Sequence, residues 1–237
     1  MLNLEILNLK FDLKVKNIAH IGAHNGKELK VYKKLFPNSQ IHLFEPNKSS
    51  FQKLKNNFKN ESNVYLYNIA LGNENQKKIL ITSKEFPNTS SLLEPKLHRK
   101  YYPEINFDNK ETVTLKKFDS LHINNINFMS IDTQGFELEV LKGATENLTH
   151  VDYLIVEINR KPLYKDSPLE KDIDKFLKLH NFIRVVTSYW GNECVWGDGF
   201  YIRKNKLSKL LIIKSYFKII LYKNILIYKL IRFIKQL

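Results

Sequence analysis

The sequence predicts an α/β fold, in which a mostly parallel sheet is covered by helices on both faces. Short apolar runs alternate with longer amphipathic stretches along most of the 237 residues, as expected when strands and helices alternate. A chain of this length buries one substantial core without a second globular unit. Gly22 and Gly26 stand directly behind the first apolar run and indicate a tight strand-to-helix turn.

The expected strands are short runs rich in apolar, aromatic and β-branched side chains. They comprise 17–21, 40–45, 63–71, 77–83, 112–118, 127–132, 152–158, 182–190 and 194–203. The runs at 127–132 and 152–158 are apolar enough to be buried on both faces, as in a parallel sheet. The last two runs follow each other closely, so we expect them to close the domain as an antiparallel pair.

The expected helices lie between these runs, at 26–36, 49–58, 136–144 and 168–181. The helix over 168–181 has the clearest amphipathic pattern, because its apolar and aromatic positions recur at helical spacing. The residues on that face are Leu169, Ile173, Phe176, Leu177 and His180.

The stretch 84–111 has neither strand nor helix periodicity over its 28 residues. Connections of this length are uncommon in compact domains and are often lids or binding loops. Its hydroxyl, cationic and aromatic side chains suit a hydroxylated or anionic acceptor. We expect the following residues to bind the substrate: Ser90, Ser91, His98, Arg99 and Tyr102. A solvated loop without a binding role is the alternative.

The turn at Gly22 and Gly26 is a candidate ligand site. In a parallel sheet, ligands bind at the carboxyl ends of the strands, where the first strand turns into its helix. Glycine adopts positive φ readily and lets another group approach the main chain. Glu45, which ends the second strand 23 residues beyond Gly22, can accept both hydroxyls of a ribose lying across the strand tips. A plain tight turn and a solvated acid are the alternatives.

Together, the glycine turn and Glu45 favour a cofactor that contains adenosine. A dinucleotide needs the third glycine of G-x-G-x-x-G beside its pyrophosphate, and "GAHNGK" lacks that spacing. A cofactor without a pyrophosphate fits the turn better, so we expect S-adenosyl-L-methionine.

Several segments along the chain resemble, in order, those of the FkbM-type S-adenosylmethionine-dependent methyltransferases. They are "HIGAHNGKE", "FEPN", "NIALGNEN", "NTSSLLEP", "TLKKFDSL", "SIDTQGFELEVLKGA", "IVEIN" and "WGDGFYIR", within residues 15–203. The most specific is "IDTQGFELEVLKGA", which resembles the family signature Asp-x-x-Gly-x-Glu-x-x-x-Leu-x-Gly nearly position for position. The resemblance implies a Rossmann-like class I methyltransferase fold, with a mostly parallel seven-stranded sheet and a C-terminal β-hairpin. It also implies O-methylation of a sugar or another hydroxyl.

The resemblance further implies which residues bind the cofactor, from its methionine half through the ribose to the adenine. These are Gly22, Ala23, Gly26, Asp132, Glu45, Asn68 and Ala70. Glu45 would hold the ribose, and Asp132 would face the amino group and the reacting centre. His20 departs from the family, which usually places Asp there, so Asp132 or Glu28 would neutralise the cofactor's ammonium. A strand-end histidine with a structural partner is the other interpretation of His20.

Methyl transfer from a sulfonium to a hydroxyl requires positioning of both reactants and removal of the hydroxyl proton. The candidate bases at the carboxyl edge of the sheet are Asp132, Glu157 and His24. Neighbouring carboxylates raise one another's pKa, which suits one of them to act as base. Alternatively, Glu157 only hydrogen-bonds the substrate, and His24 only caps the turn.

The positive charge of +14 is concentrated at the end of the chain. Residues 204–237 hold nine Lys and Arg and no acid, which leaves 29 bases against 24 acids, a net charge of +5, for residues 1–203. We therefore divide the chain into a methyltransferase domain (1–203) and a basic amphipathic helical tail (204–237). Charges interrupt the tail too often for a membrane span, but a basic amphipathic helix binds anionic membrane surfaces. Docking on the body, dimerisation and nucleic-acid binding are the alternatives.

The favoured function is therefore S-adenosylmethionine-dependent O-methylation of a hydroxyl on a sugar, glycan or lipid-linked saccharide. An RNA methyltransferase is one alternative, suggested by the pI of about 9.6 but not by any N/D-P-P-Y/F-type motif. A non-catalytic binding module with the same fold is another, and only His20 favours it.

We expect a cytoplasmic protein, peripheral on the inner membrane face. The N-terminal run lacks the unbroken apolar core of a signal peptide, and the single cysteine, Cys194, excludes an intrachain disulfide and fits a buried position in a reducing compartment. No His/Asp cluster has metal-ligand spacing, so no metal is expected. The expected partners are a hydroxylated small-molecule or glycan acceptor and a membrane surface through 206–237. A homodimer is also open, and a nucleic acid is not favoured.

Overall fold

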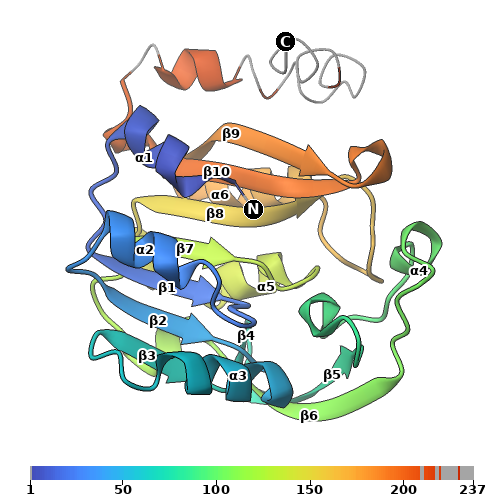
Figure 1. Cartoon of the computed structure of the whole chain (residues 1–237). Coiled ribbons are helices and arrows are strands. Elements are labelled where there is room, and N and C mark those ends of the chain that lie inside the picture. Colours follow the sequence, from blue (N-terminus) through green and yellow to red (C-terminus); the bar gives the residue numbers. More distant parts are fainter. Residues whose placement is uncertain (1, 209–210, 217–218, 220–228, 230–237) are drawn as a thin grey trace.

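The computed structural model describes residues 2–208, 211–216, 219 and 229. Its centre is a seven-stranded sheet with the strand order β3-β2-β1-β7-β8-β10-β9 (Figure 1). The strands are β1 Asn17–Ile21, β2 Gln40–Phe44, β3 Val64–Tyr67, β7 Phe128–Ile131, β8 Tyr153–Asn159, β9 Phe182–Trp190 and β10 Trp196–Arg203. Strand β10 is antiparallel to β8 and β9, and the remaining pairs are parallel. The predicted α/β fold and its closing antiparallel pair are confirmed.

Helices cover both faces of the sheet (Figure 1). One face carries α1 Leu4–Phe11, α2 Leu29–Leu35 and α3 Lys48–Phe58, and the other carries α5 Glu137–Lys142 and α6 Glu170–Leu179. Successive residues of β1 point to opposite faces. Ile18 therefore packs with α1, α2 and α3, whereas Ala19 and Ile21 pack with α5 and α6.

The sequence predicts a single strand over 63–71, but the structure divides this run into two strands. The first part of the run forms β3, in the main sheet. The last part forms β4 (Ala70–Leu71), which joins a second sheet of order β4-β6-β5, with β5 Gln76–Thr82 and β6 Asn109–Lys116. Between them, the Asn68 side-chain amide donates to the backbone oxygens of Glu45 and Pro46, at 2.9 and 3.0 Å. These bonds hold the chain against the end of β2 and redirect it out of the main sheet.

Helix α1 was not anticipated, because charged residues interrupt its apolar positions. Its N-cap is Asn3, whose Oδ1 accepts a hydrogen bond from the backbone N–H of Ile6 at 3.1 Å. Leu4 and Leu7 are buried against the sheet, and the exposed side chain of Leu9 is 89% accessible. Helix formation here depends on the two buried leucines more than on a regular apolar stripe.

The long segment 84–111 lies beyond the carboxyl ends of the central strands (Figure 1). It contains a short 3₁₀ turn at Pro87–Thr89 and the one-turn helix α4 His98–Tyr101, and β6 begins before its end. Tyr101 and Tyr102 attach it to the sheet. The Lys161 ammonium donates to the Tyr101 hydroxyl at 2.8 Å, and Trp196 Nε1 donates to the Tyr102 hydroxyl at 2.7 Å.

Residues 211–216 of the predicted tail are helical, and most of the remainder lies outside the described residues. Ile212 and Ile219 pack against the core that α1, α2 and α3 cover. In the part of the chain that the structure describes, no helix is long and apolar enough to cross a membrane. Cys194 is buried, as expected.

Candidate functional site

The strand register brings the predicted site residues together. Ile21 pairs with Phe44 on one side and with Ile131 on the other, and Ile131 pairs with Val156. The next residues of the four strands therefore form one row at the carboxyl edge of the sheet. In spatial order they are Glu45, Gly22, Asp132 and Glu157.

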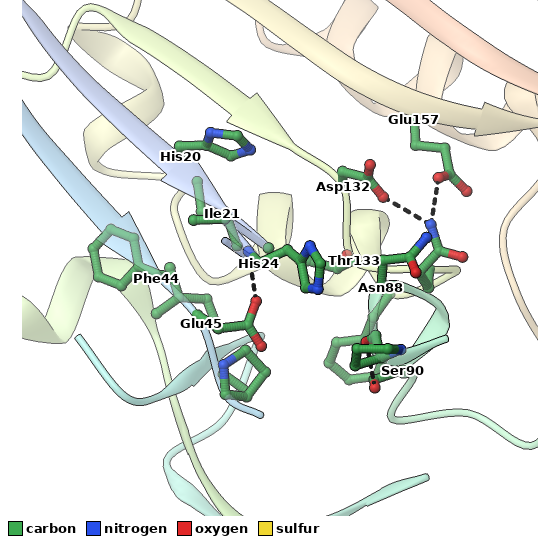
Figure 2. A pocket seen from close by; sticks show the side chains of 18 of the residues that line it. His20, Ile21, His24, Phe44, Glu45, Asn88, Ser90, Asp132, Thr133 and Glu157 are labelled. Atoms are coloured by element: carbon green, nitrogen blue, oxygen red, sulfur yellow. Dashed lines mark hydrogen bonds between the residues drawn. The ribbon is translucent and has the colours of Figure 1, made fainter. Parts of the chain in front are cut away.

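This row borders a cavity of about 350 Å³. The predicted residues that line it are Gly22, Ala23, His24, Glu45, Ala70, Ser90, Asp132 and Glu157. Figure 2 shows His24 and Glu45 on one side, Asp132 and Glu157 on another, and Asn88 and Ser90 from the long segment facing them. The segment 84–111 therefore forms one wall of the cavity.

Both turn glycines have the expected positive φ, +83° at Gly22 and +74° at Gly26. The reason why they must lack a Cβ is internal packing. A Cβ on Gly22 would lie 1.8 Å from the backbone oxygen of Asp132, and one on Gly26 would lie 2.5 Å from the Phe58 ring. The group that lies close to Gly22 is thus the backbone of Asp132, directly after the neighbouring strand β7.

Glu45 is a buried acid whose two oxygens each accept one backbone hydrogen bond. His24 N donates to Oε2 at 2.7 Å, and Asn47 N donates to Oε1 at 2.8 Å. Burial raises the pKa of Glu45 to about 7, and the two backbone bonds limit the rise. Each oxygen retains a lone pair, so the ionised carboxylate can accept two further hydrogen bonds from a ligand.

Asp132 and Glu157 are joined through the side chain of Gln134. Its Nε2 donates to Asp132 Oδ1 and to Glu157 Oε2, both at 2.8 Å (Figure 2). The Glu157 side chain is only 3% exposed, whereas Asp132 is partly exposed. Burial raises the pKa of Glu157 well above its usual value, and the charges of Asp132 and Glu137 raise it further. The protonated form of Glu157 is therefore favoured beside the Asp132 carboxylate.

Glu137 holds the turn that follows Asp132. Its Oε1 accepts from the backbone N–H groups of Thr133 and Gly135, at 2.9 and 3.0 Å. Gly135 has φ +99°, and a Cβ there would lie 3.1 Å from the Tyr164 ring. Burial raises the pKa of Glu137 to about 7, and its hydrogen bonds limit the rise. The pattern Asp-x-x-Gly-x-Glu is thus a self-capped turn that fixes the end of β7.

His20 has the structural partner that one interpretation of the sequence expects. It is 1% exposed, and its Nδ1 lies 3.2 Å from the hydroxyl of Tyr32. Burial lowers the pKa of His20 and of His24, so both rings are mainly neutral at pH 7. The Nε2 atom of His24 is buried and has no hydrogen-bond partner among the described residues. This orphaned atom, on a cavity-lining ring, is available to a ligand.

Six predicted site residues do not line the cavity: Gly26, Asn68, Ser91, His98, Arg99 and Tyr102. Gly26 and Asn68 shape its walls through the turn and the β3–β4 break described above. The Ser91 hydroxyl donates to the backbone oxygen of Gln134 at 2.7 Å, and the His98 ring packs against Tyr164. Arg99 is exposed.

Conversely, the cavity is also lined by residues for which the sequence predicts no role, among them Asn88, Thr133, Gln134 and Trp196. Polar side chains in an irregular segment carry no sign of the direction in which they point. Gln134 adopts φ +54°, and the adjacent Gly135 was the one sequence signal of an unusual turn there. In the described part of the chain, no group of three His, Cys, Asp or Glu side chains could hold a metal ion.

The chain is similar to known methyltransferases. The Methyltransferase FkbM domain family matches residues 20–184, more than half of the chain. The 2-O-methyltransferase NoeI of Sinorhizobium fredii is 25% identical over 168 residues, which cover 66% of this chain and 69% of NoeI. A crystal structure of methyltransferase FkbM from Methylobacillus flagellatus matches with a TM-score of 0.52 and 13% identity, over 79% of this chain but only 43% of that longer one. The chain belongs to the FkbM family of S-adenosylmethionine-dependent methyltransferases.

Proposed function

We propose that this methyltransferase transfers the methyl group to a hydroxyl of a saccharide acceptor, free, in a glycan or lipid-linked. The observation that carries the proposal is the Asp132–Glu157 carboxylate pair, which faces the polar side chains of Asn88 and Ser90 across the cavity. Carboxylates and amides are the groups that bind sugar hydroxyls, and a carboxylate can also remove a hydroxyl proton. The 2-O-methyltransferase activity in the name of NoeI agrees with an oxygen acceptor.

The residues of the cavity fit S-adenosylmethionine, which supplies an electrophilic methyl group when bound. The ionised Glu45 would accept the ribose hydroxyls, and the turn at Gly22 and Ala23 would contact the methionine half. His24 Nε2, which lacks a protein partner, is available to a polar group of the ligand. Apolar side chains that suit an adenine ring line the cavity near β4: Phe44, Ile69, Ala70, Leu71 and Leu80.

Asp132 is the better placed base of the two carboxylates. It is partly exposed to the cavity, whereas Glu157 is almost fully buried, with a raised pKa that favours its neutral form. The acceptor hydroxyl would hydrogen-bond to Asp132, and its proton would move to that carboxylate as the oxygen attacks. Glu157 would orient the acceptor by hydrogen bonding to it. Most of the rate enhancement would come from holding the two reactants in line.

The experiment that tests this function follows radiolabelled methyl groups from S-adenosylmethionine into three acceptor classes: neutral oligosaccharides, saccharides on a lipid carrier, and transfer RNA. The expected result is label in at least one saccharide class and none in RNA. Label in RNA alone would contradict the proposal and favour a nucleic-acid methyltransferase.

Glu45 gives a prediction about pH. Because the ionised carboxylate accepts the ribose hydroxyls, affinity for S-adenosylhomocysteine should rise as pH increases through about 7 and then level off. Glu45→Gln should weaken binding above that pH by about 1–3 kcal/mol and remove this dependence. Calorimetry across the pH range measures both, with the exposed Glu74→Gln as the matched control. Wild-type affinity in Glu45→Gln would remove Glu45 from the ribose site.

We also propose that residues 206–237 bind an anionic membrane surface. Residues 204–237 hold nine bases and no acid, which would attract this part of the chain to such a surface, and its described part exposes Ile213, which is 64% accessible. The full chain should float with anionic liposomes and not with zwitterionic ones. Neutralising three tail lysines (Lys214→Gln, Lys218→Gln, Lys223→Gln) should cost about 1 kcal/mol each at low salt.

The control for this experiment neutralises three exposed lysines of the body (Lys30→Gln, Lys77→Gln, Lys110→Gln) and should leave flotation unchanged. Binding should persist in part at high salt, because the apolar contribution to binding does not depend on salt. If the full chain ignores anionic liposomes and sediments as a dimer, the tail is an assembly segment instead.

A further inference from the structure

The side chain of Gln134 connects three residues of the site, Asp132, Glu157 and Tyr164. Its side-chain amide has two N–H donors and one acceptor oxygen. The donors bind Asp132 and Glu157, as described, and Oε1 accepts from the hydroxyl of Tyr164 at 3.0 Å. Each polar atom of the amide thus has a protein partner, and the two carboxylates hold Nε2 between them.

This arrangement is maintained at a conformational cost. Gln134 has φ +54°, a left-handed conformation that is unfavourable for most L-residues by about 1 kcal/mol. Glycine would adopt it more easily but has no amide side chain to bind the carboxylates. The strained backbone places the amide between the side chains of two neighbouring strands.

Tyr164 connects this amide to the wall formed by the long segment. Its hydroxyl lies 3.0 Å from the backbone oxygen of Thr89 as well as 3.0 Å from Gln134 Oε1. A hydroxyl has one hydrogen, so the two acceptors share or compete for it. Ser91, two residues further along, donates to the backbone oxygen of Gln134. The segment that carries Asn88 and Ser90 is thus bonded directly to the main chain of Gln134 and is linked to its side chain through Tyr164.

We propose that Gln134 is a positioning residue that holds Asp132 and Glu157 as a pair, and that Tyr164 couples this pair to the segment 87–91. The proposal rests on the proposed function for its catalytic consequence, but the coupling itself does not depend on the acceptor. When an acceptor moves the segment, the Tyr164 hydrogen is redistributed between Thr89 and Gln134. A stronger bond to Oε1 polarises the amide and strengthens its bonds to both carboxylates.

The test follows the titration of Glu157 in the full chain labelled with ¹³C-glutamate, and Glu157→Gln identifies its signal. Four ionisable groups surround Glu157. They are Asp132 directly after β7, Glu137 on α5, Asp198 on β10 and Tyr164 in the segment after β8. Gln134→Met keeps the length of the side chain and removes both donors. Because those donors offset the repulsion between the carboxylates, the titration midpoint should rise by about one pH unit.

Tyr164→Phe keeps the ring and removes only the hydroxyl, so it tests the coupling without a change of packing. It should raise the midpoint by a smaller amount, and this effect should disappear in the Gln134→Met background, as a double-mutant cycle requires for groups that act through one another. The matched control is Tyr153→Phe, whose hydroxyl accepts from Lys14 N at the opposite end of β8. It should leave the midpoint unchanged.

With an acceptor identified by the label-transfer experiment, Gln134→Met should lower kcat about 10- to 100-fold. The KM for S-adenosylmethionine should change by less than about threefold, since the glycine turn and Glu45 remain intact. An unchanged or lower Glu157 midpoint in Gln134→Met, or additive effects of the two substitutions, would overturn the proposal. Failure of every saccharide acceptor would overturn the proposed function and leave the titration results to decide the coupling.

Discussion

Asp132→Asn should lower methyl transfer by about 1,000-fold or more while the protein stays folded. The substitution keeps the size and the hydrogen bond with Gln134, but it removes the group that we propose as the acceptor of the hydroxyl proton. General base catalysis accounts for about 10²- to 10⁴-fold in enzymes. Label transfer measures the rate, and circular dichroism with thermal unfolding checks the fold.

The control for Asp132→Asn is Asp108→Asn, an exposed position in the long segment that does not line the cavity. It should retain the wild-type rate. If Asp132→Asn stays active, the base lies elsewhere, and Glu157→Gln is the next variant to measure. Loss of the rate in Glu157→Gln with an active Asp132→Asn would exchange the roles of the two carboxylates.

Arg184→Met should reduce the free energy of unfolding by about 3–5 kcal/mol, the largest effect that we expect on stability. The Arg184 side chain is 2% exposed, and its Nη2 lies 2.7 Å from Asp174 Oδ2 and its Nη1 3.2 Å from Glu170 Oε2. Removing the guanidinium leaves these acids on α6 without their cation, in a site partly shielded from water. Among the described residues, the Asp174 carboxylate would then keep the hydrogen bond from Tyr201 at 2.9 Å.

Urea unfolding measures this effect, and Lys34→Met is the matched control. Lys34 also forms an ion pair, with Glu5, but both side chains are largely exposed, so its loss should cost less than about 1 kcal/mol. Adding Glu170→Gln and Asp174→Asn to Arg184→Met should recover part of the loss, because no buried charge is then unpaired. A cost below about 1 kcal/mol for Arg184→Met would contradict this account of the ion pair.

The row of site residues could be predicted from the sequence because parallel strands end at the same edge of a sheet. Glu45, Asp132 and Glu157 each follow an apolar run, and the order of the runs places them near Gly22. The reason for glycine at position 22 could not be predicted. It depends on the backbone of Asp132, which lies far away in the sequence and only 1.8 Å from the missing Cβ.

Of the site residues predicted in the segment 84–111, fewer line the cavity than of those predicted at the strand ends. Ser90 lines the cavity, but Ser91 points to the backbone of Gln134, and His98 packs among aromatic rings. In an irregular segment, no periodicity tells which neighbour faces inward. Gln134 was missed for a related reason. Its direction follows from a left-handed φ and from the distant partners Glu157 and Tyr164, and neither has a local sequence signal.

In the function that we propose, the methyl group goes to a hydroxyl oxygen beside Asp132 and Glu157. The most direct test is to identify the methylated atom by NMR after reaction with S-adenosylmethionine that carries a ¹³C methyl group, using the wild-type chain and Asp132→Asn in parallel. We expect a methyl ether on a saccharide oxygen from the wild type and no product from Asp132→Asn. A methyl group on nitrogen or carbon, or the same ether formed at an undiminished rate by Asp132→Asn, would contradict this account.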